Sequence, residues 1–207
     1  MSLFVTGTGT DIGKTHVSCG ILRARPVRAL KPVMSGYDPL HPAASDAARL
    51  LAARGIEPTE AAIAAISPWR FTAPLSPDMA ARAEGRAIDF DALVAFCRSD
   101  DPVLIEGVGG AMVPLDDRHT VADWIGALAM PVLLVGGSYL GALSHMLTAL
   151  AALRDARIAA VVINETPGSS VGLAETADTV RRFCAAPVHV VTRDAPDDDY
   201  AALAALI

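Results

Sequence analysis

The 207-residue chain has few charged residues, few aromatic residues and only three cysteines. The cysteines, Cys19, Cys97 and Cys184, are odd in number and far apart, which argues against a disulfide framework and against a zinc site built on paired cysteines. The net charge is -6, and lysine and arginine are scattered along the chain, so it lacks the basic field that binds a nucleic-acid backbone. We therefore expect reduced cysteines and no nucleic-acid partner.

Long hydrophobic runs are also missing. No apolar stretch reaches the roughly 18 residues of a membrane-spanning helix, because glycine, proline or charge interrupts each one. Residues Met1–Val5 enter a Thr/Gly-rich segment without a charged leader or a cleavage site, so the expected location is cytoplasmic, with no membrane partner. Hydrophobic residues nevertheless make up 52% of the chain, which is typical of a large core. At this length we expect one domain over residues 1–207.

Short β-branched apolar runs alternate with longer Ala/Leu-rich segments. The runs are 3–6, 28–33, 103–106, 131–135, 159–164 and 188–191, and the helical segments are 13–25, 43–54, 90–98, 141–155 and 172–184. Runs without polar alternation are typical of parallel strands covered on both faces. The pattern predicts an α/β fold, a doubly wound, mostly parallel sheet with helices on both faces and a ligand site at the carboxyl ends of its strands. Residues 55–85, with four prolines, are expected to be an excursion over that site.

A glycine-rich segment, Gly7–Thr15, joins the first apolar run to the first helical segment. It ends in Gly13-Lys14-Thr15, as the phosphate-binding motif G-x-x-x-x-G-K-[ST] does, although Thr8 stands where the motif has its first glycine. In such a loop the backbone N–H groups cradle phosphate oxygens, the lysine bridges the β- and γ-phosphates, and the hydroxyl binds Mg²⁺. An ordinary glycine-rich turn would not explain why Gly-Lys-Thr opens a helix, so we predict a nucleoside triphosphate site.

Two carboxylates and a second lysine are candidates to complete that site. Glu106 ends an apolar run and precedes Gly107–Gly110, whose backbone can approach phosphate closely. Asp46 is either a Mg²⁺ ligand or a first-turn carboxylate that complements a helix dipole. Lys31 is either a second cation over the transferring phosphate or a solvated strand-edge lysine. Lys14 and Lys31 are both expected in strand-end loops outside the core, so that alanine variants would lose turnover while the fold persists.

In order and spacing these segments resemble the dethiobiotin synthetases. The resemblance covers most of the chain up to about residue 165 and rests on Gly7–Thr15, Lys31–Gly36, Ser45–Ala47, Pro74–Pro77, Glu106–Gly110, Asp123–Trp124, Leu140–Gly141, His145 and Asn164. It implies a homodimer that uses ATP and Mg²⁺. The implied reaction adds CO2 to an amine of 7,8-diaminopelargonate, lets the carbamate attack the γ-phosphate of ATP, and closes a cyclic urea. Its products are dethiobiotin, ADP and phosphate.

The resemblance also implies a role for each candidate residue. The implied catalytic residues are Lys31, Lys14 and Thr10, and the implied metal ligands are Thr15, Asp46 and Glu106. The implied nucleotide-binding residues are Thr10, Asp11, Ile12, Gly13, Lys14, Thr15, Asp46, Glu106, Gly107, Val108, Gly109 and Asn164. The implied substrate-binding residues are Ser35, on the diamine, and Ala142, Leu143 and Ser144, which start a helix that receives the substrate carboxylate across the dimer interface.

The two ends of the nucleotide site differ in how well they match the family. Asn164 follows an apolar run and is expected to read the base edge, because an amide can both donate and accept hydrogen bonds. After Pro187 the chain departs from the family pattern, since Val190–Pro196 replaces a stretch that normally helps to enclose the base.

The main alternative is a partitioning-type P-loop ATPase, a switch that moves a protein partner or cargo. Such ATPases carry a lysine early in the phosphate loop, where this chain has Gly9. A cobyrinate-amidation relative would need an added glutaminase domain, and a non-catalytic nucleotide-binding module would leave the two lysines and two acids unexplained. The side chains of His16, His145, Trp69 and Trp124 are expected to have packing or hydrogen-bonding roles only.

Overall fold

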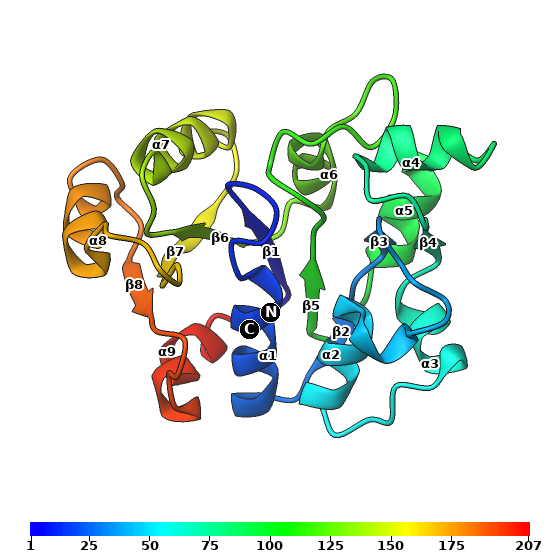
Figure 1. Ribbon diagram of the computed structural model, residues 1–207, viewed down its shortest axis with the longest axis horizontal. Helices are drawn as coiled ribbons and strands as arrows, with labels where there is room; N and C mark the ends of the chain where they lie inside the picture. The colour runs from blue at the N-terminus through cyan, green and yellow to red at the C-terminus, as the bar shows by residue number, and fades with distance from the viewer.

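A six-stranded parallel sheet forms the centre of the computed structural model, which describes residues 1–207 (Figure 1). Its strand order is β2-β5-β1-β6-β7-β8. The strands are β1 (Leu3–Gly7), β2 (Arg28–Leu30), β5 (Val103–Glu106), β6 (Val132–Gly137), β7 (Ile158–Asn164) and β8 (Val188–Val191). All neighbouring pairs run parallel, so the predicted doubly wound α/β fold is confirmed.

Helices cover both faces of this sheet. One face carries α1 (Lys14–Ala24) and the short α9 (Ala201–Ala204), and the other carries α5 (Phe90–Cys97), α6 (Val121–Leu128), α7 (Ala142–Ala152) and α8 (Leu173–Arg181). Successive strand residues point to opposite faces: Phe4 packs edge-on against Trp124 of α6, at 4.8 Å between ring centroids, whereas Leu3 and Val5 pack toward α1. This double burial explains why the strand sequences lack polar alternation. None of the helices is long and apolar enough to cross a bilayer.

The prediction of one strand over residues 28–33 is wrong, because the chain leaves the main sheet after Leu30. The backbone N–H of Lys31 donates to the Ile66 carbonyl at 3.1 Å, and Pro32 has no N–H with which to extend the ladder. The next two residues form β3 (Val33–Met34), which pairs with β4 (Trp69–Arg70) in a separate two-stranded sheet. The break leaves Lys31 at the carboxyl end of β2.

Residues 55–85 contain more regular structure than the prolines indicated. They include α3 (Glu60–Ile66), β4 and α4 (Pro77–Ala83), and the Pro74–Pro77 turn lines the main cavity, as expected of an excursion over the site. The predicted helix 43–54 is shorter: a 3-10 turn, η1 (Pro42–Ala44), precedes α2 (Asp46–Ala53). Helix α2 starts late because the Ser45 side chain caps it, accepting from the Ala48 N–H at 3.2 Å.

Two further elements are a 3-10 turn before α9 and helix α6. Three consecutive aspartates, Asp197–Asp199, lie in the 3-10 turn η2 (Asp197–Tyr200) just before α9. Helix α6 was not predicted, although Thr120 and Asp123 form a capping box at its start, a signal that is readable in the sequence.

Candidate active site

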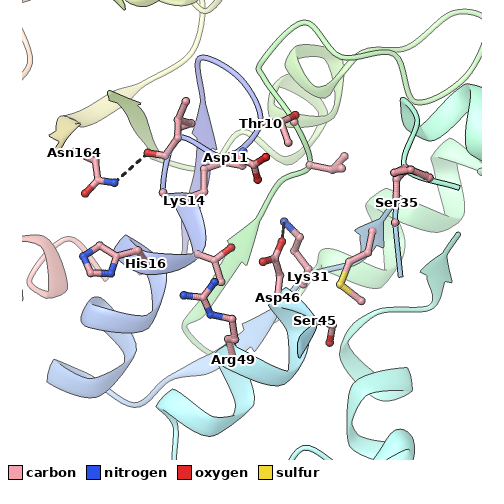
Figure 2. A pocket seen from close by; sticks show the side chains of 18 of the residues that line it. Thr10, Asp11, Lys14, His16, Lys31, Ser35, Ser45, Asp46, Arg49 and Asn164 are labelled. Atoms are coloured by element: carbon pink, nitrogen blue, oxygen red, sulfur yellow. Dashed lines mark hydrogen bonds and ion pairs between the residues drawn. The ribbon is translucent and has the colours of Figure 1, made fainter. Parts of the chain in front are cut away.

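A cavity of about 980 Å³ lies at the carboxyl ends of the central strands (Figure 2). The strand register brings its parts together, because Val5 is level with Glu106, Leu30 with Ile105, and Gly137 with Asn164. The chain segments that follow β1, β2, β5 and β7 therefore meet at one edge of the sheet. The lining comprises Thr10–His16, Lys31, Met34–Tyr37, Ala44–Asp46, Arg49, Pro74–Pro77, Val108, Gly109, Val113, Asn164–Pro167, Arg193 and Asp194.

The phosphate loop presents a row of free donors to this cavity. No backbone N–H from Gly9 to His16 donates a hydrogen bond within the chain. Gly13 starts α1 with a φ of 92°, and a Cβ at this position would lie 1.9 Å from Asn164 Nδ2, so the position requires glycine. Unpaired N–H groups at a helix N-terminus form an anion site, which is what the sequence predicted here.

Behind the loop lies a buried group of charged and polar side chains. Lys31 Nζ donates to Glu106 Oε1 at 2.7 Å and to the Gly107 carbonyl at 2.8 Å, and Asp46 Oδ2 lies 3.3 Å away. Thr15 Oγ1 donates to the same Glu106 oxygen at 2.7 Å. The side chains of Lys31 and Glu106 are 3% and 0% exposed, so the expectation that Lys31 lies outside the core is wrong.

Burial and neighbouring charge shift the two lysines in opposite directions. Burial disfavours the charged form of Lys31, but the Glu106 and Asp46 carboxylates outweigh that effect and raise its pKa above the ordinary value. Lys14 is also buried, contrary to expectation, and its Nζ donates only to the Gly9 carbonyl, at 2.7 Å. Burial, and then the charge of Lys31, lower the pKa of Lys14 to about 8. Lys31 is thus held charged at neutral pH, whereas the charged form of Lys14 would be stabilised by an anionic ligand.

The oxygen atoms around Lys31 fit a hard divalent cation. The hydroxyl of Thr15 and the carboxylates of Asp46 and Glu106 lie around one point at the floor of the cavity. Glu106 Oε2 is buried without a hydrogen-bond partner, which leaves an acceptor free. Burial opposes the charged form of Asp46, but the charge of Lys31 and then the nearby Thr15 hydroxyl lower its pKa, so it remains ionised. Ionised oxygen donors of this kind suit Mg²⁺.

The opposite end of the cavity is formed by the ends of β7 and β8. Asn164 Nδ2 donates to the Ile12 carbonyl at 3.2 Å, so this amide also holds the phosphate loop in place. Asn164 Oδ1 is buried and has no partner. Arg193 and Asp194, from the segment that departs from the family pattern, are exposed on the cavity wall.

The remaining candidates divide into three groups. Thr10, Asp11, Ile12, Val108, Gly109 and Ser35 all line the cavity, whereas Glu106 and Gly107 lie buried behind its wall. Ala142, Leu143 and Ser144, at the start of α7, do not line it. His145 accepts or donates a 2.7 Å hydrogen bond with Tyr139, and Trp124 is fully buried, in agreement with packing or hydrogen-bonding roles.

Solved structures with a similar fold come from two other kinds of protein. They are HypB from Helicobacter pylori in complex with nickel (TM-score 0.53, 15% identity, covering 99% of this chain and 83% of that one) and a ParA family ATPase from Chlorobium tepidum (TM-score 0.51, 12% identity, covering 96% and 87%). At these identities the likeness shows only the fold, a P-loop NTPase-like α/β architecture. A family model described as an AAA domain matches residues 1–191.

Sequence relatives are much closer. ATP-dependent dethiobiotin synthetase from Acidiphilium cryptum is 51% identical, covering 94% of this chain and 93% of the relative, and that from Methylobacterium nodulans is 47% identical, covering 93% of each. The enzyme from Caulobacter sp. (strain K31) is 54% identical over 80% of this chain and 76% of its own. The chain belongs to the ATP-dependent dethiobiotin synthetase family. This membership confirms the resemblance drawn from the phosphate loop and Lys31–Gly36, and the ParA likeness gives no support to the partitioning-ATPase alternative beyond the shared fold.

Several residues of this dethiobiotin synthetase cavity were not anticipated as site residues. His16, Tyr37, Arg49 and Arg193 all line it. Arg49 had a readable signal, because it follows Asp46 by three residues and therefore lies on the same face of a helix. Arg193 had none, since its position depends on how the end of β8 turns toward the cavity.

Proposed function

We propose that the chain converts 7,8-diaminopelargonate, CO2 and ATP into dethiobiotin, ADP and phosphate, with Mg²⁺, as one catalytic domain over residues 1–207. The observation that carries the proposal is the buried Lys31–Glu106–Thr15 group, which lies directly behind a loop of unpaired N–H groups. Phosphoryl transfer requires mainly positioning and charge neutralisation, and this arrangement supplies both without a protein nucleophile. The family membership supplies the substrate class.

In this proposal the phosphate loop and Lys14 hold the triphosphate. The free N–H groups of Gly9–His16 donate to phosphate oxygens, and Lys14 exchanges its hydrogen bond to the Gly9 carbonyl for one to phosphate. Burial makes this exchange favourable, because an anion restores the charge stabilisation that Lys14 lacks in its desolvated position. Thr10, on the cavity wall, faces the same region.

Lys31 acts on the transferring group. Glu106 and Gly107 accept two of its three N–H donors, and these bonds fix the direction of the ammonium. The third N–H faces Asp46 Oδ2 at the longer distance of 3.3 Å, and in this proposal it shifts from Asp46 to the reacting oxygens. A carbamate oxygen attacks the γ-phosphorus, and the bond to the bridging oxygen of ADP breaks. The second amine then attacks the carbamate carbon, phosphate leaves with the attacking oxygen, and the amine releases its proton as the urea ring closes. Lys31 stabilises the negative charge that develops on these oxygens.

Thr15, Asp46 and Glu106 are the residues that would hold Mg²⁺. The unpaired Glu106 Oε2 and the ionised Asp46 supply two carboxylates, and the Thr15 hydroxyl supplies a neutral oxygen. When bound, the cation neutralises charge on the phosphate oxygens. Thr15 and Glu106 lie on different elements, α1 and β5, so the core of the sheet fixes their separation.

The substrate side of the proposal includes a second copy of the chain. Ser35 lines the cavity and would contact the diamine. Ala142, Leu143 and Ser144 lie away from the cavity of their own chain, which agrees with their serving the cavity of a partner. Gly141 is the N-cap of α7, with a φ of 96° and no side-chain cap. The Ala142 N–H donates to the Tyr139 carbonyl, whereas the N–H groups of Leu143 and Ser144 have no partner in the chain and could bind a carboxylate. Leu140, just before it, is 91% exposed and would be covered in a homodimer.

The test is phosphate release by the purified protein with Mg²⁺, ATP and bicarbonate, with and without 7,8-diaminopelargonate, while dethiobiotin is followed by mass. We expect phosphate release that depends on the diamine and matches dethiobiotin one to one. Diamine-independent release, or release without a product of the cyclic-urea mass, would overturn the proposed reaction.

A further inference from the structure

Helix α2 places a second side chain on the face that carries Asp46. Arg49 follows Asp46 by three residues, so both side chains project on the same side of the helix, one turn apart. Cys19 of α1 lies against this turn, with its Sγ 3.5 Å from the Arg49 carbonyl. Figure 2 shows Arg49 extending between His16 on one side and Asp46 on the other.

The Arg49 guanidinium has no partner within the chain. It forms no ion pair and donates no hydrogen bond. By contrast, Arg23 of α1 is paired with Asp197 at 2.7 Å. A guanidinium carries five N–H donors in a fixed fork that matches phosphate oxygens. The charge of Lys31 is already balanced by Glu106 and Asp46, whereas the charge of Arg49 is not balanced by any carboxylate. An unpaired, forked cation therefore lies on the wall of a cavity built for an anion.

The position of Arg49 indicates which phosphates it reaches. Lys14 and Lys31 lie at the end of the cavity where the proposal places phosphoryl transfer, here called the chemical end. Asn164 lies at the other end, where we expect the nucleotide base, here called the base end. Arg49 and His16 line the main cavity and are also the two residues it shares with a smaller neighbouring cavity of about 370 Å³. They form the side wall next to the first turn of α1, and Figure 2 shows Arg49 between Asn164 on one side and Lys31 on the other. In the proposed site this is the position of the middle of the nucleotide.

We propose that Arg49 binds the α- and β-phosphate oxygens of the nucleotide from α2, opposite the phosphate loop, with His16 flanking it on α1. The inference rests on the proposed nucleotide site and adds a residue to it. Because Arg49 approaches from a different element than the loop, it clamps the phosphate chain from a second side. It also links nucleotide binding to the helix that carries Asp46.

The experiment measures binding of ADP and of pyrophosphate to the full chain by calorimetry, without diamine, for the wild type and Arg49→Gln. We expect both ligands to bind about 10-fold more weakly to the variant, as loss of a charge-assisted hydrogen bond predicts. The matched control is Arg25→Gln, which makes the same charge change at an exposed arginine outside both cavities and should leave both affinities unchanged. Melting temperatures check that each variant is folded.

Three results would overturn the inference. The first is that Arg49→Gln binds both ligands with wild-type affinity. The second is a loss of affinity for ADP alone, which would place Arg49 on the ribose or base, and the third is an equal loss in Arg25→Gln, which would show that only the overall charge of the protein matters. Dethiobiotin formation is scored separately. A wild-type chain that binds ADP but makes no dethiobiotin contradicts the proposed reaction, whereas unchanged binding in Arg49→Gln alongside normal product contradicts only the Arg49 contact.

Discussion

The two ends of the cavity are built in different ways. At the chemical end, Lys31 and Glu106 are almost fully buried and hydrogen-bonded to each other and to the backbone. At the base end, Asn164 is the buried polar residue, and Pro167, Arg193 and Asp194 near it on the cavity wall are exposed. The first end belongs to the core of the sheet, and the second belongs to surface loops.

This difference shows at which end of the cavity the fold gives up stability for the sake of function. Burying a charged pair is costly unless its geometry and remaining hydrogen bonds are satisfied, and replacing such a pair by apolar residues is often neutral or stabilising. The chain nevertheless keeps the pair, at the point where the proposed reaction develops negative charge. Groups fixed in advance need not reorganise in the transition state, which is where electrostatic catalysis gains most.

The largest effect is expected from Lys31→Met, which breaks the buried pair. Turnover should fall by at least about 10²- to 10³-fold, because a donor to the reacting oxygens is lost. Stability should also fall, by about 3–5 kcal/mol, because Glu106 is left as an uncompensated buried charge. The measurements are steady-state turnover and urea unfolding.

The double variant Lys31→Met/Glu106→Gln separates the two roles of Lys31. It should regain most of the lost stability, since position 106 no longer carries an uncompensated buried charge, while turnover stays low. Recovery of turnover, or unchanged stability in the single variant, would contradict the account of the chemical end.

Lys14→Met tests the same end at a residue that binds phosphate but holds no structural pair. We expect turnover to fall by about 10²-fold. Because the pKa of Lys14 is lowered from 10.5 to about 8, the charged form is disfavoured in the fold. That cost is fully present below pH 8 and fades as the pH rises toward 10.5, since the unfolded chain then also loses the proton.

The stability of Lys14→Met relative to the wild type should depend on pH, and this dependence tests the burial of the Lys14 charge. Without nucleotide or metal, Lys14→Met should gain stability relative to the wild type at pH 7, and the gain should shrink by roughly 1–3 kcal/mol at pH 10. Packing changes that do not depend on pH cancel in this difference. Urea unfolding at both values checks it, and a gain that is equal at both would show that Lys14 is not desolvated as described.

At the base end, Asn164→Ala should have a smaller effect, and on a different parameter. Asn164 Oδ1 is a buried acceptor without a partner, suited to an exocyclic amino group, and Nδ2 holds the Ile12 carbonyl. We expect the KM for ATP to rise about 10-fold, with kcat changed much less. The ratio of kcat/KM for ATP over GTP should also fall toward one. An unchanged ratio would show that Asn164 supports only the loop.

The same two ends show what the sequence could reveal. The phosphate loop, Glu106 and the alternation of parallel strands with helices were predictable, because parallel strands ending in glycine or acid bring their ends to one edge. The burial of Lys31 was not, since it follows from Pro32 turning the chain into a second sheet. Arg193 was likewise unpredictable, because its place depends on a surface loop and not on any periodic pattern.

The smallest effect concerns the reactivity of the three cysteine thiols, which reports how well the fold shields each one from solvent. Cys19 and Cys97 are buried, and burial raises their pKa values to about 11 and 12. Cys184, between α8 and β8, is only half-buried. At pH 8 a thiol reagent should label Cys184 first, with Cys19 and Cys97 reacting only on unfolding, as peptide mass mapping would show. Labelling of Cys19 as fast as Cys184 in the folded chain would mean that the reagent reaches the interior between α1 and α2, which would contradict the burial described for Cys19.

The most direct test of the central claim follows the oxygen atom that the reaction transfers. If a carbamate oxygen attacks the γ-phosphorus, that oxygen leaves with phosphate when the ring closes. In short reactions started with ¹⁸O-labelled CO2, diamine, Mg²⁺ and ATP, we expect the released phosphate to carry one ¹⁸O atom for each dethiobiotin formed. Unlabelled phosphate formed together with dethiobiotin would contradict phosphoryl transfer to the carbamate in this cavity.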